Sequence, residues 1–264
     1  MRSFIHSFIE TGSDRVLVCA DFAYGYPAGL ASLLPKATNG ASAPWRVVWD
    51  HLASQIKDDL GAKAGRVPTN RNNRFEVASA INATASSDGA PGPFWCLMSA
   101  GSVICVPQNQ PPQPFVAING QTIAPRRITD IRARSDTPFR LFGTGSVGSQ
   151  VLTGIPRIAK IRFDGRLAGC SAVWPFETGW APANGAWLFP RLRVLHAEIY
   201  PSPRASLADS IKDRGQVRGM WHWVRDLDIR NRLQNEFGAP GRITLESKDD
   251  LAIRTEEGWI LGCP

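Results

Sequence analysis

An uninterrupted apolar run, Val16-Leu-Val-Cys-Ala20, sets the strongest limit on the fold because no polar residue breaks it and an aspartate ends it. Such a run is typical of a strand that is buried on both faces, as in a parallel sheet covered by helices. Residues 192–200 predict a second strand, in which Val194, His196 and Glu198 share one face. Because strands alternate with helical segments, the sequence predicts an α/β fold.

Helical periodicity recurs between these strands. We expect Gly154 and Pro156 to interrupt the helix that follows Gly148, and Gly238 with Pro240 to stop the helix that begins near Val217. The predicted helices cover residues 4–9, 45–60, a stretch from Gly148 and residues 217–237, the last after a capping-box pattern at Ser206–Asp209.

Residues 61–125 are rich in Gly, Pro, Asn and Ser, and they predict an irregular insertion. The tail, residues 243–261, reads as two short strands. Since the sequence shows no internal repeat and no linker between comparable halves, we predict a single domain over residues 1–264.

Composition limits the partners and the compartment. Thirty Lys and Arg against 23 Asp and Glu give a net charge of +7, which slightly favours a nucleic acid, a nucleotide or another polyanion as partner over a composition without functional meaning. The five cysteines show no C-x-x-C pair and predict free thiols in a cytoplasmic protein. The segment Gly89–Pro125 is uncharged, but its prolines make a membrane helix implausible, so no membrane partner is expected.

Three acids are candidates for chemistry, and each has a structural alternative. Asp21 ends the buried strand, where α/β sheets bind ligands, but it could equally cap the following turn. Glu198 lies in a strand and could simply pair with Arg193 or Arg204. Asp213 begins a helix, where negative charge is favourable in any case.

If Asp21, Glu198 and Asp213 converge, they could hold Mg²⁺ or Mn²⁺, because carboxylate oxygens suit hard cations. The four histidines show no metal-ligand spacing. The segment Gly143–Gly148 satisfies G-x-G-x-x-G, yet a poor strand precedes it, so a helix start that presents backbone N–H groups to an anion is favoured over a dinucleotide site.

Two basic segments, Asn70–Phe75 and Pro125–Arg127, could contact phosphate through Arg74 and Arg127, with Phe94 and Trp95 as stacking platforms. Solvated loops without a function are the favoured alternative for both segments.

Several motifs together resemble one bacterial family, over almost the whole chain. They are Asp21-Phe-Ala-Tyr-Gly-Tyr-Pro-Ala-Gly29, Asn72-Asn-Arg-Phe75, the segment Gly145–Pro156, Val173-Trp-Pro-Phe-Glu-Thr178, Glu198-Ile-Tyr-Pro-Ser202, Ile211-Lys-Asp-Arg-Gly-Gln-Val217 and Glu257-Gly-Trp-Ile-Leu-Gly262. The family looks like a branch of the DUF429 group of predicted RNase H-like nucleases, and its members often carry labels linked to cobalamin or molybdopterin biosynthesis.

The resemblance implies an RNase H-like mixed sheet with flanking helices and with acidic residues at one end. Asp21, Glu198 and Asp213 match the family's acids and would be metal ligands for Mg²⁺ or Mn²⁺. Lys212 would contact phosphate near them, and Gln150 matches a further motif position for phosphate or substrate.

The chain departs from the family at its start, because it lacks the strand hairpin whose V-D-W-S-like motif supplies the leading metal ligand. The missing hairpin would leave a sheet edge open, which the tail or a second copy in a homodimer could cover. Either the start of the sequence is misassigned or the protein lacks part of the sheet, and the leading prediction is a nuclease-like phosphoester hydrolase. The alternative is a non-catalytic protein that binds a nucleotide or a cofactor intermediate, and a nucleotide-dependent enzyme that uses Gly143–Gly148 is a third reading.

Overall fold

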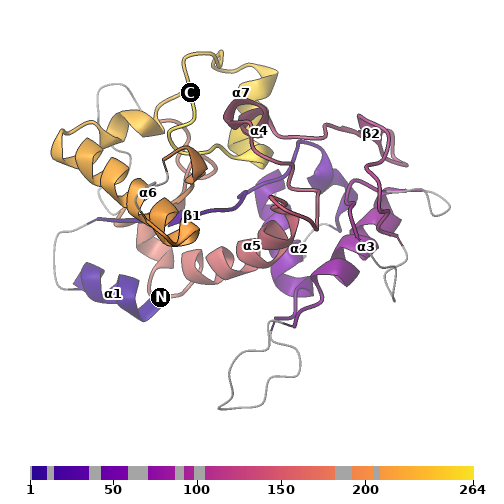
Figure 1. The fold of residues 1–264 in the computed structure, drawn as a ribbon, viewed down its shortest axis with the longest axis horizontal. Coiled ribbons are helices and arrows are strands. Elements are labelled where there is room, and N and C mark those ends of the chain that lie inside the picture. Colours follow the sequence, from indigo (N-terminus) through magenta and orange to yellow (C-terminus); the bar gives the residue numbers. More distant parts are fainter. Residues whose placement is uncertain are drawn as a thin grey trace.

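The computed structural model describes residues 2–10, 15–35, 43–58, 71–86, 92–97, 105–181, 192–204 and 209–264. Within them the central feature is a small parallel sheet of three strands in the order β1-β5-β4 (Figure 1). The strands are β1 (Val16–Ala20), β4 (Ser171–Val173) and β5 (Val194–Glu198). Both predicted strands and the α/β class are therefore confirmed, while β4 was not predicted.

The middle strand separates two hydrophobic clusters because its side chains alternate between the faces of the sheet. Val194 packs in the larger cluster with helices α2 (Pro44–Gln55) and α5 (Gly148–Arg162). Leu195 and Ala197 pack in the second cluster, with Trp174 and Trp259. The apolar run of β1 thus lies between two packed layers, as its composition predicts.

The helices of the first layer follow the sequence patterns closely. Helix α1 spans Arg2–Glu10, and α2 ends at Gln55, five residues before the predicted end. Helix α5 continues through Pro156 to Arg162, so the predicted interruption is wrong. The proline removes the N–H that the carbonyl of Leu152 would accept, but tight packing of α5 in the core offsets that loss.

The predicted irregular insertion contains regular structure. Helix α3 (Arg74–Ala85) lies within it, followed by the antiparallel strands β2 (Phe115–Val116) and β3 (Thr122–Ile123), and α4 (Ile128–Ala133) comes shortly after. Asn82 explains why α3 was missed: this amide is fully buried and exchanges hydrogen bonds with the backbone of Phe94. Part of the insertion, including residues 59–70, lies outside the described residues.

The second face of the sheet is covered by α6 (Lys212–Ile229), the 3-10 turn η4 (Leu233–Phe237) and the C-terminal residues. The predicted tail strands are wrong: the tail forms α7 (Lys248–Ala252) and a π-helical turn, η5 (Ile253–Glu257). A single bridge joins Ile260 to Glu198, so among the described residues the tail extends the sheet beside β5 and leaves β1 at the edge. Most of the predicted capping box at Ser206–Asp209 lies outside the described residues.

Candidate functional site

Asp21 and Glu198 meet at the carboxyl edge of the sheet. In the parallel register Ala20 lies opposite Glu198, and Asp21 is the next residue of β1. The amide of Ile199 donates to the carbonyl of Ala20 at 3.0 Å, so the two strands separate only beyond this point. The predicted convergence of these two positions at one edge is confirmed.

The carboxylate of Glu198 is buried and fully occupied. Arg127 donates to it twice, from Nη2 to Oε1 at 2.6 Å and from Nη1 to Oε2 at 2.7 Å. The backbone N–H of Tyr24 donates to Oε2 at 3.0 Å. Burial raises the pKa of Glu198, and the charge of Arg127 opposes that increase. Glu198 therefore pairs with an arginine, which is the structural alternative that the sequence offered, although the partner is Arg127 rather than Arg193 or Arg204.

The guanidinium of Arg127 is also buried, and its hydrogen-bond donors are all used. Its side chain is 1% exposed, and its Nε and Nη2 also donate to the carboxylate of Asp130 at 3.0 and 2.7 Å. Nη1 further donates to the carbonyl of Glu257 at 2.9 Å, so all five guanidinium N–H groups have acceptors. Both sequence interpretations of Arg127, a phosphate contact and a solvated loop residue without a function, are wrong, because the guanidinium is buried and enclosed by carboxylates of its own chain.

The turn that follows Asp21 is fastened by buried carboxylates of η5. Glu256 accepts hydrogen bonds from the amides of Gly29 and Ala31, and Glu257 accepts from those of Ala28 and Ile128, at distances of 2.7–3.0 Å.

Gly25 in the same turn has no room for a side chain, because a Cβ atom there would lie 2.1 Å from the carbonyl oxygen of Glu256. These contacts hold the backbone that carries Asp21 in one position.

Asp21 itself is exposed and has no hydrogen bond or ion pair within the described residues. Its pKa is raised to about 6, first by partial burial and then by the negative charges of Glu198 and Asp213, while the positive charge of Lys212 lowers it. The charges of Lys212 and Asp213 thus act on Asp21, and the joint role of these residues stays a prediction. We call these three residues the acidic rim.

The start of α6 supplies two members of the acidic rim. Lys212 and Asp213 are exposed in the first turn of this helix, without hydrogen bonds to other described side chains. Asp209, shortly before, is different because Arg214 and Arg218 pair with it at 2.9 and 2.7 Å. Hydrogen bonding to Arg214 lowers the pKa of Asp209 to about 2, whereas no arginine of the described residues pairs with Asp21.

The acidic rim offers few direct ligands for a metal ion. Among the residues that the structure describes, no group of three His, Cys, Asp or Glu side chains is close enough to hold one. Mg²⁺ is commonly bound through one or two carboxylates, with water and substrate phosphates completing the shell. Asp21 and Asp213 fit that arrangement, while Glu198 has no free oxygen for it.

Gln150 stands on α5, the helix that contacts the residue after Asp21. The ring of Phe22, next to Asp21, packs against Gly154 of α5, where a Cβ atom would lie 2.5 Å from it. Gln150 is exposed and stands one helical turn before Gly154, on the same side of α5.

Arg74 reaches the first turn of α5, because its Nε donates to Ser149 Oγ at 3.2 Å. Its Nη1 donates to Asn72 Oδ1 at 2.7 Å, and its guanidinium stacks 4.2 Å from the ring centre of Phe75. Burial lowers the pKa of Arg74. The predicted contacts Arg74 and Gln150 therefore lie on consecutive parts of one surface, and their role stays a prediction.

In the glycine-rich segment, Gly148 at the start of α5 is required by packing. Gly148 lies so close to the carbonyl oxygen of Arg140 that a Cβ atom would stand 2.5 Å from it. The residues before the segment form only an isolated bridge between Trp95 and Arg140, not the strand that a dinucleotide site needs.

Sequence reasoning missed the roles of Asp130, Glu256 and Glu257. Glu256 and Glu257 stood in a segment read as strand, where adjacent residues point to opposite faces. A usable signal was Ser247 three residues before Asp250, a capping pattern that predicts a helix start just ahead of η5.

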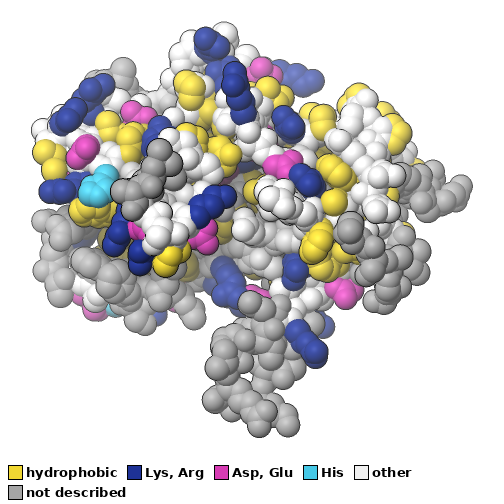
Figure 2. Space-filling view, in the orientation of Figure 1, with side chains coloured by type: hydrophobic (Ala, Val, Ile, Leu, Met, Phe, Trp, Pro, Cys, Tyr) yellow, Lys and Arg dark blue, Asp and Glu magenta, His cyan; other side chains and the backbone are white. Residues whose placement is uncertain are grey.

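No protein-family model, no curated protein and no solved structure matches this chain. No helix in the described part of the chain has the length and apolar character that crossing a membrane requires. Figure 2 shows Lys and Arg side chains scattered over the viewed face rather than gathered in one patch.

Proposed function

We propose that the acidic rim binds a divalent cation, Mg²⁺ or Mn²⁺, together with a phosphate group, and that the protein is an RNase H-like, metal-dependent phosphoester hydrolase acting on a nucleic acid or nucleotide. The observation that carries the proposal is the state of Asp21: burial and then the negative charges of Glu198 and Asp213 raise its pKa to about 6, and no arginine among the described residues pairs with it. Structural acids in this chain, such as Glu198 and Asp209, have arginine partners.

Each residue of the acidic rim has a distinct role in the proposal. Asp21 and Asp213 hold the cation, and Lys212 contacts the phosphate at the start of α6. A bound divalent cation would lower the pKa of a coordinated water and offset negative charge on the phosphate. Hydrolysis then joins the water oxygen to phosphorus, breaks the bond to the leaving oxygen, and transfers the water's proton to that oxygen. Glu198 acts as a positioning residue, because it holds Arg127 and the amide of Tyr24.

The test is hydrolysis of single-stranded and duplex nucleic acid and of a nucleotide phosphodiester in Mg²⁺ and in Mn²⁺. We expect Asp21→Asn to lower the rate at least about a hundredfold, because it removes a carboxylate that holds the charge of the reacting centre. Asp226→Asn, at an exposed position of the same helix as Asp213, is the matched control and leaves the rate unchanged. Equal rates for wild type and Asp21→Asn would contradict the proposal.

A second candidate is a non-catalytic protein that binds a nucleotide or a cofactor intermediate. The saturation of Glu198 by Arg127 favours it, because the acid that matches the second family ligand has no free oxygen. Under this proposal the wild type shows no hydrolysis, and a nucleotide or corrinoid raises the melting temperature without a metal ion. Thermal shifts that occur only with Mg²⁺ or Mn²⁺ would argue against it.

A further inference from the structure

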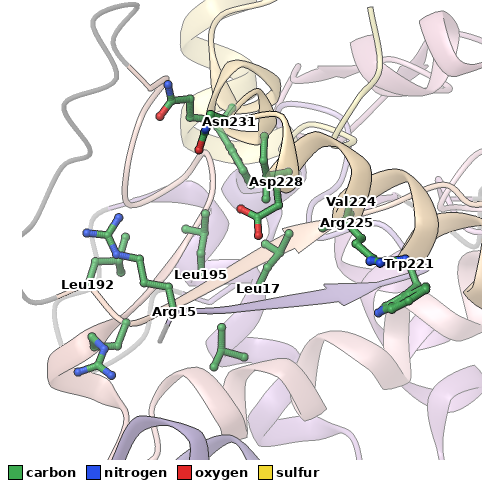
Figure 3. A pocket seen from close by; sticks show the side chains of 14 residues that line it. Arg15, Leu17, Leu192, Leu195, Trp221, Val224, Arg225, Asp228 and Asn231 are labelled. Atoms are coloured by element: carbon green, nitrogen blue, oxygen red, sulfur yellow. The ribbon is translucent and has the colours of Figure 1, made fainter. Parts of the chain in front are cut away.

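A cavity of about 570 Å³ lies over the starts of β1 and β5, whereas Asp21 follows the end of β1. Figure 3 shows the side chains that line the cavity. The starts of β1 and β5 form one wall, and the second half of α6 with η4 forms the other. Its volume is within the range of about 300–1,000 Å³ that small-molecule sites occupy. Arg15 precedes β1 and Asp21 follows it, so about five residues of extended strand separate the two sites.

The cavity exists because α6 packs few of its side chains against the sheet. Of its eighteen residues only Gly215 and Met220 are buried, although Trp221 and Val224 place apolar surface on the side of the cavity. Trp221 is 56% exposed, an unusual state for a large aromatic ring on a helix that covers a sheet. A ligand with an apolar body would cover this surface together with Leu17 and Leu195 of the sheet.

Positive charge lies at both ends of the cavity, with two arginines at one end and one at the other. Arg15 is exposed and has no ion pair within the described residues. In the parallel register it lies beside Arg193, which donates to the carbonyl of Ile9 at 3.4 Å and adds a second positive charge. At the far end of the cavity, Arg225 stacks 5.2 Å from the ring centre of Trp221 (Figure 3).

A carboxylate limits how many anionic groups the cavity accepts. Asp228 points from α6 toward Leu17, between the ends that carry Arg15 and Arg225 (Figure 3). A polyanion that filled the cavity would meet this like charge, whereas an apolar segment with one terminal anionic group would avoid it.

We infer that this cavity binds a small amphipathic organic anion, with a single anionic group at Arg15 and an aromatic or aliphatic body between α6 and the sheet. Leu17, Leu195 and Val224 contact the body, and Trp221 covers its far end. The inference does not depend on the acidic rim or on hydrolysis, because the two sites share no residue.

The test compares two dyes with the same aromatic body, 1-anilinonaphthalene-8-sulfonate and the neutral N-phenyl-1-naphthylamine. We expect the sulfonate to bind once per chain, with increased fluorescence. Arg15→Ala should weaken its binding about tenfold, because one charge-assisted contact is lost, while the neutral dye loses less than about threefold. Arg15→Lys should restore most of the affinity, and Arg230→Ala, an exposed arginine outside the cavity, should change neither dye.

A second variant tests the cavity itself. Val224→Trp fills it and should abolish binding of both dyes, whereas Val217→Trp, on the same helix but 70% exposed and outside the cavity, should leave binding intact. Unchanged binding in Val224→Trp, or equal losses of both dyes in Arg15→Ala, would overturn the inference. Light scattering completes the test: a dimer that Val224→Trp converts to a monomer would show that a second copy occupies the cavity, which also overturns it.

Discussion

Glu198 and Asp21 lie one residue apart across paired strands, yet the chain treats their charges in opposite ways. Glu198 is 3% exposed and is held by a guanidinium and a backbone amide. Asp21 is exposed, lacks such a partner among the described residues and has a raised pKa. A buried charge must be paired because desolvation is costly, whereas an exposed charge can stay unpaired and remain available to a ligand. The degree of burial therefore distinguishes the structural acid, Glu198, from the candidate functional acid, Asp21.

The largest effect that this comparison predicts is a loss of unfolding free energy when the buried acid, Glu198, loses its partner. Arg127→Met leaves Glu198 and Asp130 without their partner, and we expect a loss of about 3–5 kcal/mol in unfolding free energy. Urea unfolding at pH 7 measures it.

The control is Arg157→Met, which removes an ion pair with Asp58 that is largely exposed and should cost less than about 1 kcal/mol. Combining Arg127→Met with Glu198→Gln should cost less than the sum of the single changes, because the two residues interact directly. A loss below about 1 kcal/mol in Arg127→Met would show that the buried network is not what fixes Glu198.

A smaller loss of unfolding free energy is expected when the turn that follows Asp21 loses its hydrogen bonds. Glu256→Ala leaves the amides of Gly29 and Ala31 without acceptors, which should cost about 2–3 kcal/mol. Glu256→Gln keeps one carbonyl oxygen, so it should lose about half as much. Urea unfolding measures both variants, and equal losses would mean that side-chain packing, rather than the hydrogen bonds, holds the turn.

The smallest effect has the opposite sign. Because the pKa of Asp21 is raised from 3.8 to about 6, the folded state binds more protons than the unfolded state between these values. The contribution that protonated Asp21 makes to the free energy of unfolding is therefore lost as the pH rises from about 4 through 6.

Asp21→Asn should thus stabilise the protein at pH 7 by about 1 kcal/mol, after allowance for the exposure of this side chain, and should have no effect near pH 3. Urea unfolding at the two pH values is the measurement, with Asp226→Asn as the control. Destabilisation of Asp21→Asn at pH 7 would show that this carboxylate has a stabilising partner after all.

The fold was predictable where local pattern dominates. Strands β1 and β5 follow from an apolar run and from alternation, and their shared edge follows from the parallel connection. Helix α3 was missed because a buried polar residue, Asn82, stands in its apolar face. The tail was misread because its apolar residues around Trp259 suggested strands, although Ser247 caps a helix.

The sequence predicts that Asp21 and Glu198 lie at one edge of the sheet, but it does not predict which arginine pairs with Glu198. A chain with 24 arginines offers many partners for Glu198, and nothing local distinguishes Arg127 from the rest. That pairing spans 71 residues and depends on α4 lying against the end of β5. Long-range contacts of this kind are set by tertiary packing, which periodicity does not report.

The most direct test is a carbon-detected NMR titration of the Asp21 carboxyl group, with and without Mg²⁺. We predict a pKa near 6 without metal, in line with the raised value that Glu198 and Asp213 help to produce, and a clear decrease when Mg²⁺ is added. Asp213→Asn should also lower the pKa of Asp21 in the absence of metal. A carboxyl group that titrates near 3.8 and does not respond to Mg²⁺ would contradict the claim that this edge of the sheet holds an uncompensated, cation-binding acid.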